Sequence, residues 1–214
     1  MAYKRILTIQ DISCVGQCSM TVAMPILSAC GHETCILPTA LLSTHTGGFG
    51  KPVVVHYDHA LEGIIAHWKE NNITFDAVLV GYLGSTAAIE MTERILSEML
   101  APGGISIVDP AMADNGNLYP AFDDVYVTAM KRLCANADFV IPNLECPLAD
   151  INKYKPIKKS GPNLICDTAN VCFLKALNAD AVTLANNHIG DFGKGAVKET
   201  LGLLEANNIK YAGA

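Results

Sequence analysis

Short polar stretches directly follow five apolar segments of this chain, and their residue types suit the binding of a small polar ligand and a phosphate. In chain order the stretches are QD (10–11), STHTGG (43–48), GYLGS (81–85), DPAMADNG (109–116) and PNLE (142–145). They supply hydroxyl, imidazole and carboxylate groups together with flexible glycines. We therefore predict a site for a polar heteroaromatic substrate and a phosphate donor with its metal.

The elements around these stretches must bring them together. Apolar runs rich in Ile and Val alternate with longer segments of helical period, which is the pattern of a parallel sheet with crossover helices. The predicted strands are 5–9, 33–37, 77–82, 105–108 and 138–141, and the predicted helices are about 16–30, 59–72, 86–99 and 123–133. Ligands of such sheets bind beyond the carboxyl ends of the strands, where the polar stretches lie.

A lysine-rich, proline-containing stretch at 142–163 interrupts the alternation. Beyond it we expect a strand at 163–166, a short helix at 171–177, a strand at 180–185 and a helix at 196–208. The predicted fold class is α/β, a doubly wound, mostly parallel sheet flanked by helices and followed by a smaller α/β segment. The predicted domains are 1–142 and 143–214.

Composition restricts the class of partner. The 214 residues include 15 basic and 21 acidic ones, a net charge of −6, which argues against binding to nucleic acid and favours a small molecule. The first residues lack the apolar core of a signal peptide, and no run reaches membrane-spanning length, so we expect a cytoplasmic protein without a membrane partner. Eight cysteines without a C-x-x-C pair predict buried free thiols rather than disulfides or zinc ligands.

Each candidate side chain also has a purely structural interpretation. Asp11 could cap the turn after its strand, and His45 could be a solvated loop histidine. Tyr82 could be an aromatic residue at the edge of the core, and Asp109 could end its strand before Pro110. Asp114 belongs to a turn signature, Asp-Asn-Gly, that occurs in many chains.

The first two thirds of the chain resemble pyridoxal (pyridoxamine) kinases of the ribokinase-like superfamily. The resemblance is collinear to about residue 143 and is carried by RILTIQDISCVGQCSMTVAMPILSACGHETCILPTALLSTHTGGF (5–49), ITFDAVLVGYLGS (73–85), IVDPAMADNGNLYP (107–120) and ADFVIPN (137–143). It implies an incomplete ribokinase-like fold and a vitamin B6 vitamer (pyridoxal, pyridoxamine or pyridoxine) as substrate. It also implies ATP and Mg²⁺ as cofactors, phosphorylation of the 5′-hydroxymethyl group, and a homodimer.

The resemblance implies a role for individual residues in the vitamer pocket. Asp11 stands where the family often has a serine near the pyridoxal ring, and His45, Thr46 and Tyr82 are implied to line the same pocket.

The resemblance also implies contacts to nucleotide and metal. Asp109 and Asp114 match acidic positions near the metal and the phosphates, and Asn143 matches the asparagine of a P-N-x-x-E pattern. That pattern places glutamate at position 146, where this chain has Cys146, and Glu145 comes one place early.

One family segment is absent from the sequence. The Gly-Thr-Gly-Asp segment, which in the family supplies backbone amides and the catalytic aspartate, appears nowhere after residue 143. Because phosphoryl transfer depends on such positioning and charge stabilisation, we expect impaired activity and assign no catalytic residue.

The last third resembles a different family, the poly-gamma-glutamate capsule-synthesis proteins, whose fold is similar to metal-dependent phosphoesterases. The similarity is carried by NLECPLAD (143–150), PIKKSGPN (156–163) and LANNHIGDFGKGAVKETLGLLEANNIKYAGA (184–214). It implies that Glu145, Asn187 and His188 lie near a metal. Structurally, Asn186 and Asn187 could instead serve as turn residues, and Asp191 as a local cap.

Three functions therefore remain open. The chain is predicted to be a chimera whose first part is a pyridoxal kinase-like phosphotransferase. The alternatives are a fragment of a phosphoesterase-like capsule-synthesis protein and an inactive chimeric binding module.

Overall fold

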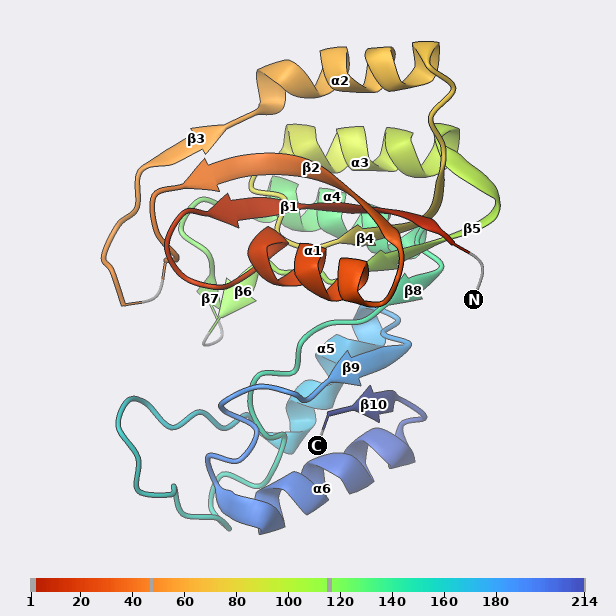
Figure 1. Cartoon of the computed structure of the whole chain (residues 1–214). Helices are drawn as coiled ribbons and strands as arrows, with labels where there is room; N and C mark the ends of the chain where they lie inside the picture. Colours follow the sequence, from red (N-terminus) through yellow and green to blue (C-terminus); the bar gives the residue numbers. More distant parts are fainter. Residues whose placement is uncertain (1–2, 47, 115–116, 214) are drawn as a thin grey trace. The chain divides into compact units, whose positions relative to one another are not determined.

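The computed structural model describes residues 3–46, 48–114 and 117–213 (Figure 1). The chain divides into two compact units, Met1–Asp138 and Phe139–Ala214. A mostly parallel sheet with helices characterises the first, and a small α/β arrangement the second. The predicted α/β fold class is confirmed.

Within the first unit the main sheet has the strand order β3-β2-β1-β4-β5. Its strands are β1 (Arg5–Ser13), β2 (Glu33–Leu42), β3 (Val54–His56), β4 (Phe75–Val80) and β5 (Leu100–Val108), and the short strand β8 (Phe139–Val140) begins the second unit. The pairs β1–β2, β1–β4 and β4–β5 are parallel, whereas β3 runs antiparallel to β2 at the edge. The carboxyl ends of β1, β2, β4 and β5 therefore meet at one side of the sheet.

The first two strands are longer than predicted. Gln10 and Asp11 were expected after the first strand, but both lie within β1, and the β1–β2 register shifts between Gln10 and Ile12. A shift of this kind bends a strand and redirects its side chains, and Asp11 is the residue at that point.

Some predictions of strands were wrong or incomplete. The stretch 163–166 forms no strand and contributes only an isolated bridge between Leu148 and Cys166. The sequence did not indicate the edge strand β3, nor the antiparallel pair β6 (Ala113–Asp114) and β7 (Asn117–Leu118). The turn predicted at Asp-Asn-Gly includes residues 115–116, which lie outside the described residues.

Helices lie on both faces of the sheet. They are α1 (Met20–Ala29), α2 (Asp58–Glu70), α3 (Thr86–Glu98) and α4 (Asp124–Ala135). Figure 1 shows α1 over one face and α2, α3 and α4 together on the other. Side-chain caps begin two of them, because Ser85 accepts from the Ala88 N–H and Asp123 from the Tyr126 N–H, both at 3.0 Å.

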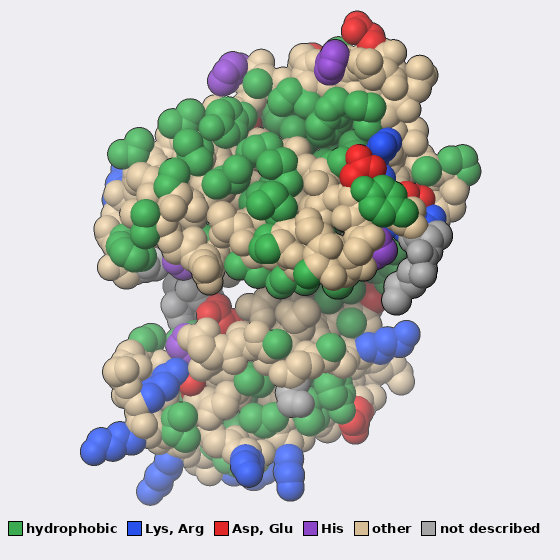
Figure 2. All heavy atoms as spheres, viewed as in Figure 1, with side chains coloured by type: hydrophobic (Ala, Val, Ile, Leu, Met, Phe, Trp, Pro, Cys, Tyr) green, Lys and Arg blue, Asp and Glu red, His purple; other side chains and the backbone are tan. Residues whose placement is uncertain are grey.

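Helix α1 is less well supported than the others. It contains Pro25 and has no side-chain cap at its start, and among its residues only Met20 is buried. Val22, Met24 and Ile26 are exposed. Figure 2 shows a broad area of apolar side chains on this face of the first unit. The helix is therefore only weakly anchored by burial.

The second unit has its own core. Its elements are a 3₁₀ turn η1 (Thr168–Asn170), α5 (Val171–Ala176), β9 (Ala181–Thr183), α6 (Gly193–Ala206) and β10 (Lys210–Ala212). Strands β9 and β10 are parallel. The buried core consists of Leu148, Leu174, Val182, Leu184, Leu204 and Ile209.

The cysteines differ from the prediction of burial. All eight are free thiols, but only Cys134 is buried, whereas Cys14, Cys30 and Cys172 are exposed and the others are half-buried. No helix within the described residues is both long and apolar enough to cross a membrane.

Candidate functional site

A cavity of about 230 Å³ opens at the carboxyl ends of the strands in the first unit. Four predicted residues, Asp11, His45, Thr46 and Tyr82, line it together. The remaining lining residues are Ser13, Cys18, Ser19, Leu42, Ala111, Tyr119 and Pro120. The structure thus brings together the four side chains that the resemblance assigned to one pocket.

Asp11 forms the buried polar end of this cavity. Asp11 is 4% exposed, and Ser13, which also lies in β1, is 2% exposed. Burial raises the pKa of the Asp11 carboxyl, while hydrogen bonds with Ser19 and Ser13 and the charge of His45 act in the opposite direction. Asp11 is therefore a buried residue within β1, near hydroxyl groups that oppose the effect of burial on its pKa.

The loop that carries His45 is fixed by its backbone. The His45 N–H donates to the Val15 carbonyl at 2.8 Å. Gly16 has φ 101°, and a Cβ on it would lie 2.7 Å from the His45 Cβ. Only glycine therefore allows this close approach, which presents the exposed His45 and Thr46 side chains at the cavity.

Gly16→Ala is expected to destabilise the first unit by about 2 kcal/mol, because the left-handed backbone and the contact with His45 both oppose a side chain. The change should also weaken ligand binding, since the His45 loop must move. Thermal unfolding and ligand titration measure the two effects.

Two glycines serve as matched controls. Gly31 has φ 84° but nothing near its Cβ position, so Gly31→Ala reports the backbone strain alone. Gly63 lies within α2 in open space, and Gly63→Ala should stabilise the protein by up to about 1 kcal/mol. An equal loss of stability in Gly16→Ala and Gly31→Ala would show that the contact with the His45 Cβ does not destabilise the protein.

Tyr82 provides an aromatic wall. It follows β4 after Gly81, and its ring centroid lies 6.0 Å from that of Tyr119 and 5.5 Å from that of Phe122. Burial, with a further contribution from the charge of Asp11, raises the pKa of the Tyr82 hydroxyl. The hydroxyl therefore stays protonated near neutral pH, beside the second lining tyrosine, Tyr119.

Of the acidic residues predicted for nucleotide and metal, Asp109 does not line this cavity. Asp109 follows β5, and its N–H donates to the Val80 carbonyl at 2.9 Å. The pKa of the buried Cys134 thiol is raised to about 11, first by burial and then by the charge of Asp109, which places this carboxylate near Cys134. The side chain of Asp114 lies outside the described part of the chain.

Asn143 and Glu145 belong to the second unit. Asn143 is exposed, and its Oδ1 accepts from Asn186 Nδ2 at 3.2 Å and from Thr183 Oγ1 at 3.3 Å. Asn143 therefore connects its segment to β9, and Glu145, two positions further along the chain, is half-buried.

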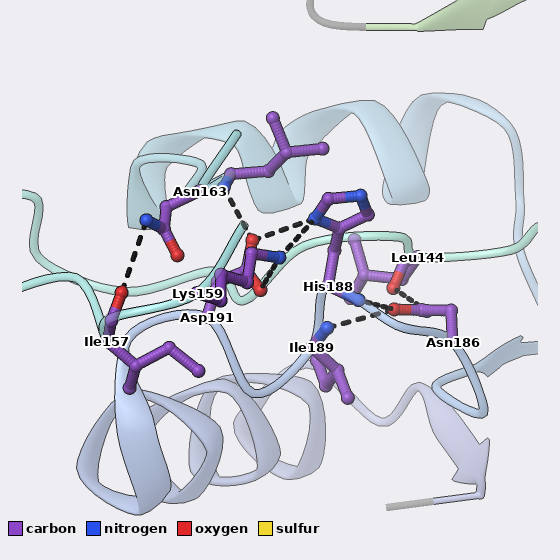
Figure 3. A network of polar contacts seen from close by, with 9 residues as sticks. Leu144, Ile157, Lys159, Asn163, Asn186, His188, Ile189 and Asp191 are labelled. Carbon is purple, nitrogen blue, oxygen red and sulfur yellow. Dashed lines mark hydrogen bonds and ion pairs between the residues drawn. The ribbon is translucent and has the colours of Figure 1, made fainter. Parts of the chain in front are cut away.

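The turn that carries His188 is organised by Asn186 (Figure 3). Asn186 Oδ1 accepts from the N–H groups of His188 and Ile189 at 3.1 and 2.9 Å, and its Nδ2 donates to the Leu144 carbonyl at 2.9 Å. Asn187, which was assigned to a metal, is exposed. Within this pair the turn role belongs to Asn186.

A buried carboxylate holds His188 in place. Asp191 is 1% exposed on its side chain, and its Oδ2 lies 2.7 Å from His188 Nδ1. The other oxygen accepts from Lys159 Nζ, and the Leu164 N–H also donates to Oδ2 at 2.8 Å. Figure 3 shows the side chains of Lys159, His188 and Asp191 meeting at one point, with the second imidazole nitrogen directed away from the other two. Asp191 is thus a buried anchor and more than a local cap.

Only part of this network was predictable from the sequence. The spacing of His188 and Asp191 was visible as an i, i+3 pair, but nothing distinguished Lys159 from Lys155 and Lys158 in the same stretch. Burial by itself raises the pKa of Asp191, yet hydrogen bonds from Lys159, His188 and the backbone outweigh it and lower this pKa.

The lowered pKa predicts a pH dependence of stability. In the unfolded chain the pKa of Asp191 is the ordinary value of about 3.9, and in the folded protein it is lower. The stabilisation that Asp191 provides is therefore complete above about pH 4 and is lost as the pH falls through the folded pKa. We expect the free energy of unfolding of the second unit to fall more steeply below about pH 4 in the unmodified protein than in Asp191→Asn. NMR signals of α6 during acid titration in denaturant provide the measurement.

A second carboxylate titrates in the same range. The pKa of Glu199 is lowered to about 2, chiefly by the hydrogen bond from Lys153 and then by the one from Tyr154. Glu199 is present in both proteins, so the difference between them isolates Asp191. Identical acid profiles would contradict the assigned role.

Among the residues that the structure describes, no group of three or more His, Cys, Asp or Glu side chains could hold a metal ion. Glu145 and His188 therefore do not belong to a cluster of that size. A complete metal centre would need ligands from elsewhere.

Comparison with protein families decides the membership of the chain. The model of the bacterial capsule synthesis protein family, PGA_cap, matches residues 91–214. The chain belongs to the PGA_cap family. The match begins within α3, so it covers part of the first unit as well as the second.

Solved structures similar to this PGA_cap member are small-molecule kinases. Pyridoxal kinase from Lactobacillus plantarum matches with a TM-score of 0.62 and 39% identity over 66% of this chain and 50% of its own. A phosphomethylpyrimidine kinase from Bacteroides thetaiotaomicron, in a form with pyridoxal, matches with a TM-score of 0.65 and 30% identity over 97% of this chain and 61% of its own. Pyridoxal kinase from Leishmania donovani with ADP and pyridoxine matches with a TM-score of 0.52 and 25% identity over 65% of this chain and 50% of its own.

Both resemblances seen in the sequence are therefore confirmed. The PGA_cap member spans about half the length of the pyridoxal kinases that it matches. None of the curated proteins matches it.

Proposed function

We propose that the first unit binds a vitamin B6 vitamer in the cavity lined by Asp11, His45, Thr46 and Tyr82, and that the chain is a pyridoxal kinase-like phosphotransferase with impaired turnover. The observation that carries the proposal is the convergence of these four side chains on one cavity. Pyridoxal and pyridoxine bound to structural neighbours support the choice of ligand.

The cavity suits a single-ring compound. Its volume of about 230 Å³ lies below the range of roughly 300–1,000 Å³ that is common for drug-sized ligands. Tyr82 and Tyr119 offer aromatic surface to a pyridine ring, and the buried Asp11 can accept from a polar ring substituent. His45 and Thr46 are exposed, so they can reach the substituents nearest to solvent.

Impaired turnover follows from the missing transfer groups. Phosphoryl transfer requires donors that stabilise the moving phosphoryl group and a base that orients the attacking hydroxyl. The Gly-Thr-Gly-Asp segment that would supply both is absent from the sequence. Vitamer binding is therefore the part of the activity that the residues lining the cavity support.

Binding and turnover are tested separately. Isothermal titration of the whole chain with pyridoxal should give saturable binding, and benzaldehyde, which lacks the ring nitrogen and hydroxyl groups, should bind more weakly. Formation of pyridoxal phosphate with ATP and Mg²⁺ is followed by absorbance and compared with a complete pyridoxal kinase. Absence of pyridoxal binding would refute the proposed ligand, and a rate equal to that of the complete kinase would refute the proposed impairment.

A second candidate function is favoured by the family match to residues 91–214. We propose as the alternative a fragment of a phosphoesterase-like capsule-synthesis protein in which Glu145, Asn187 and His188 bind a metal. Its test is metal content after dialysis against Mn²⁺, together with hydrolysis of p-nitrophenyl phosphate. Stoichiometric metal that is lost in His188→Ala supports it, and a metal-free, inactive protein excludes it.

The two similarities also support a chimera of a kinase-like and a capsule-synthesis-like part. We propose the parts 1–142 and 143–214, and the family match extends beyond the second of them, to residue 91. Sequencing genomic DNA across the codons for residues 140–150 tests whether the junction exists in the organism. If neither function is found, the remaining proposal is an inactive chimeric binding module.

A further inference from the structure

Two cysteines of the second unit lie on neighbouring, hydrogen-bonded segments although 20 positions separate them in the sequence. Cys146 follows the segment that pairs with β9, and Cys166 precedes the turn η1. The backbone holds the two segments together, since the Cys166 N–H donates to the Pro147 carbonyl and the Ala149 N–H to the Cys166 carbonyl, both at 2.9 Å. The Cys146 thiol is also the first cause of the lowered pKa of Cys166, which places the two side chains near one another.

The surroundings of Cys166 favour a thiolate. Asn170 Nδ2 donates to the Cys166 Sγ at 2.9 Å, which stabilises negative charge on sulfur. The pKa of Cys166 is lowered to about 6, and the largest cause is the interaction with Cys146. Burial acts in the opposite direction, and the hydrogen bond from Asn170 lowers the pKa further. Both cysteines are half-buried, so a small oxidant can reach them.

We propose that Cys146 and Cys166 form a peroxide-reactive dithiol site in which Cys166 is oxidised first and Cys146 then closes a disulfide. The co-reactant is a hydroperoxide. In the first step the Cys166 thiolate attacks one peroxide oxygen, the O–O bond breaks, and sulfenic acid and hydroxide are formed. In the second step the Cys146 sulfur attacks the sulfenic sulfur, the S–O bond breaks, and the hydroxyl leaves with the Cys146 proton as water. The two thiols together lose two electrons, and the peroxide gains them.

The other six cysteines provide the comparison. Cys172 and Cys30 are more exposed than Cys166, and burial raises the pKa values of Cys134 and Cys35. If exposure alone governed oxidation, Cys172 and Cys30 would react first. The dithiol site predicts instead that Cys166 reacts before them, by about tenfold at neutral pH, because the Asn170 hydrogen bond stabilises its thiolate and Cys146 is near enough to trap the sulfenic acid.

The test uses the full chain, reduced and then treated with substoichiometric hydrogen peroxide at neutral pH. Peptide mapping without reduction should find the Cys146–Cys166 disulfide and the loss of two hydrogens, and dithiothreitol should restore both thiols. Cys146→Ser should stop at the sulfenic acid on Cys166, which dimedone labels. Cys166→Ser should remove the fast phase, whereas the matched control Cys172→Ser should leave it unchanged.

The direct mapping of the unmodified protein does not depend on whether the variants fold. Oxidation of Cys172 or Cys30 ahead of Cys166, or a disulfide between any other pair, overturns the proposal. So does a fast phase that persists at the same rate in Cys166→Ser.

Discussion

Asp191→Ala is expected to lower the free energy of unfolding of the second unit by about 3 kcal/mol, because the change leaves the charge of Lys159 without its buried partner. The carboxylate is 1% exposed and accepts from Lys159, His188 and the Leu164 N–H, so water cannot easily replace it. Small domains have only about 5–15 kcal/mol of stability, which makes the loss readily measurable. Denaturant unfolding followed through NMR signals of α6 gives the value.

The lysine-rich stretch offers a matched control for this prediction. Lys159 and Lys158 are neighbours, but only Lys159 contacts Asp191, and Lys158 is exposed. Lys159→Met should destabilise the second unit, whereas Lys158→Met should change its free energy of unfolding by no more than about 0.5 kcal/mol. Equal effects of the two changes would contradict the anchoring role of the network.

His45→Ala is expected to weaken pyridoxal binding by about tenfold to a hundredfold, since a hydrogen bond to a charged group contributes about 1.5–3 kcal/mol. This expectation depends on the proposed vitamer site. The loop should stay in place, because its position depends on the His45 N–H and on Gly16, which the change does not affect. Isothermal titration with pyridoxal measures the affinity.

A second histidine controls for the general effect of losing an imidazole. His59 is exposed on α2 and does not line the cavity, so His59→Ala should bind pyridoxal as the unmodified protein does. If His45→Ala keeps full affinity while its thermal midpoint is unchanged, the ligand does not contact His45.

Much of the fold was predictable because its signals are local. Helix α3 was expected at 86–99 and spans Thr86–Glu98, where Ser85 caps its start and Ile89 and Ile95 mark its buried face. The end of β1 was not predictable in this way. Gln10 and Asp11 are polar residues in a place that suggests a turn, but Gln10 pairs with Pro38 of β2 and the pairing resumes at Ile12, so the strand continues through Asp11.

The candidate cavity was predictable in part for a different reason. Asp11 and Tyr82 could be grouped because parallel strands place their carboxyl ends together. Ser19 and Tyr119 were not predicted, because both are common residue types that reach the cavity only through reversals of the chain. At Ser19 the backbone is left-handed, with φ 47°. No sequence pattern indicated that reversal.

The weak anchoring of α1 affects how a ligand could enter the first unit. Pro25 has no amide hydrogen, and the helix begins directly after Ser19, which with Cys18 lines the cavity. We therefore expect amide hydrogens of α1 to exchange with deuterium faster than those of the well-capped α3, and bound pyridoxal to slow that exchange. Local opening of α1 would then act as the gate of the cavity.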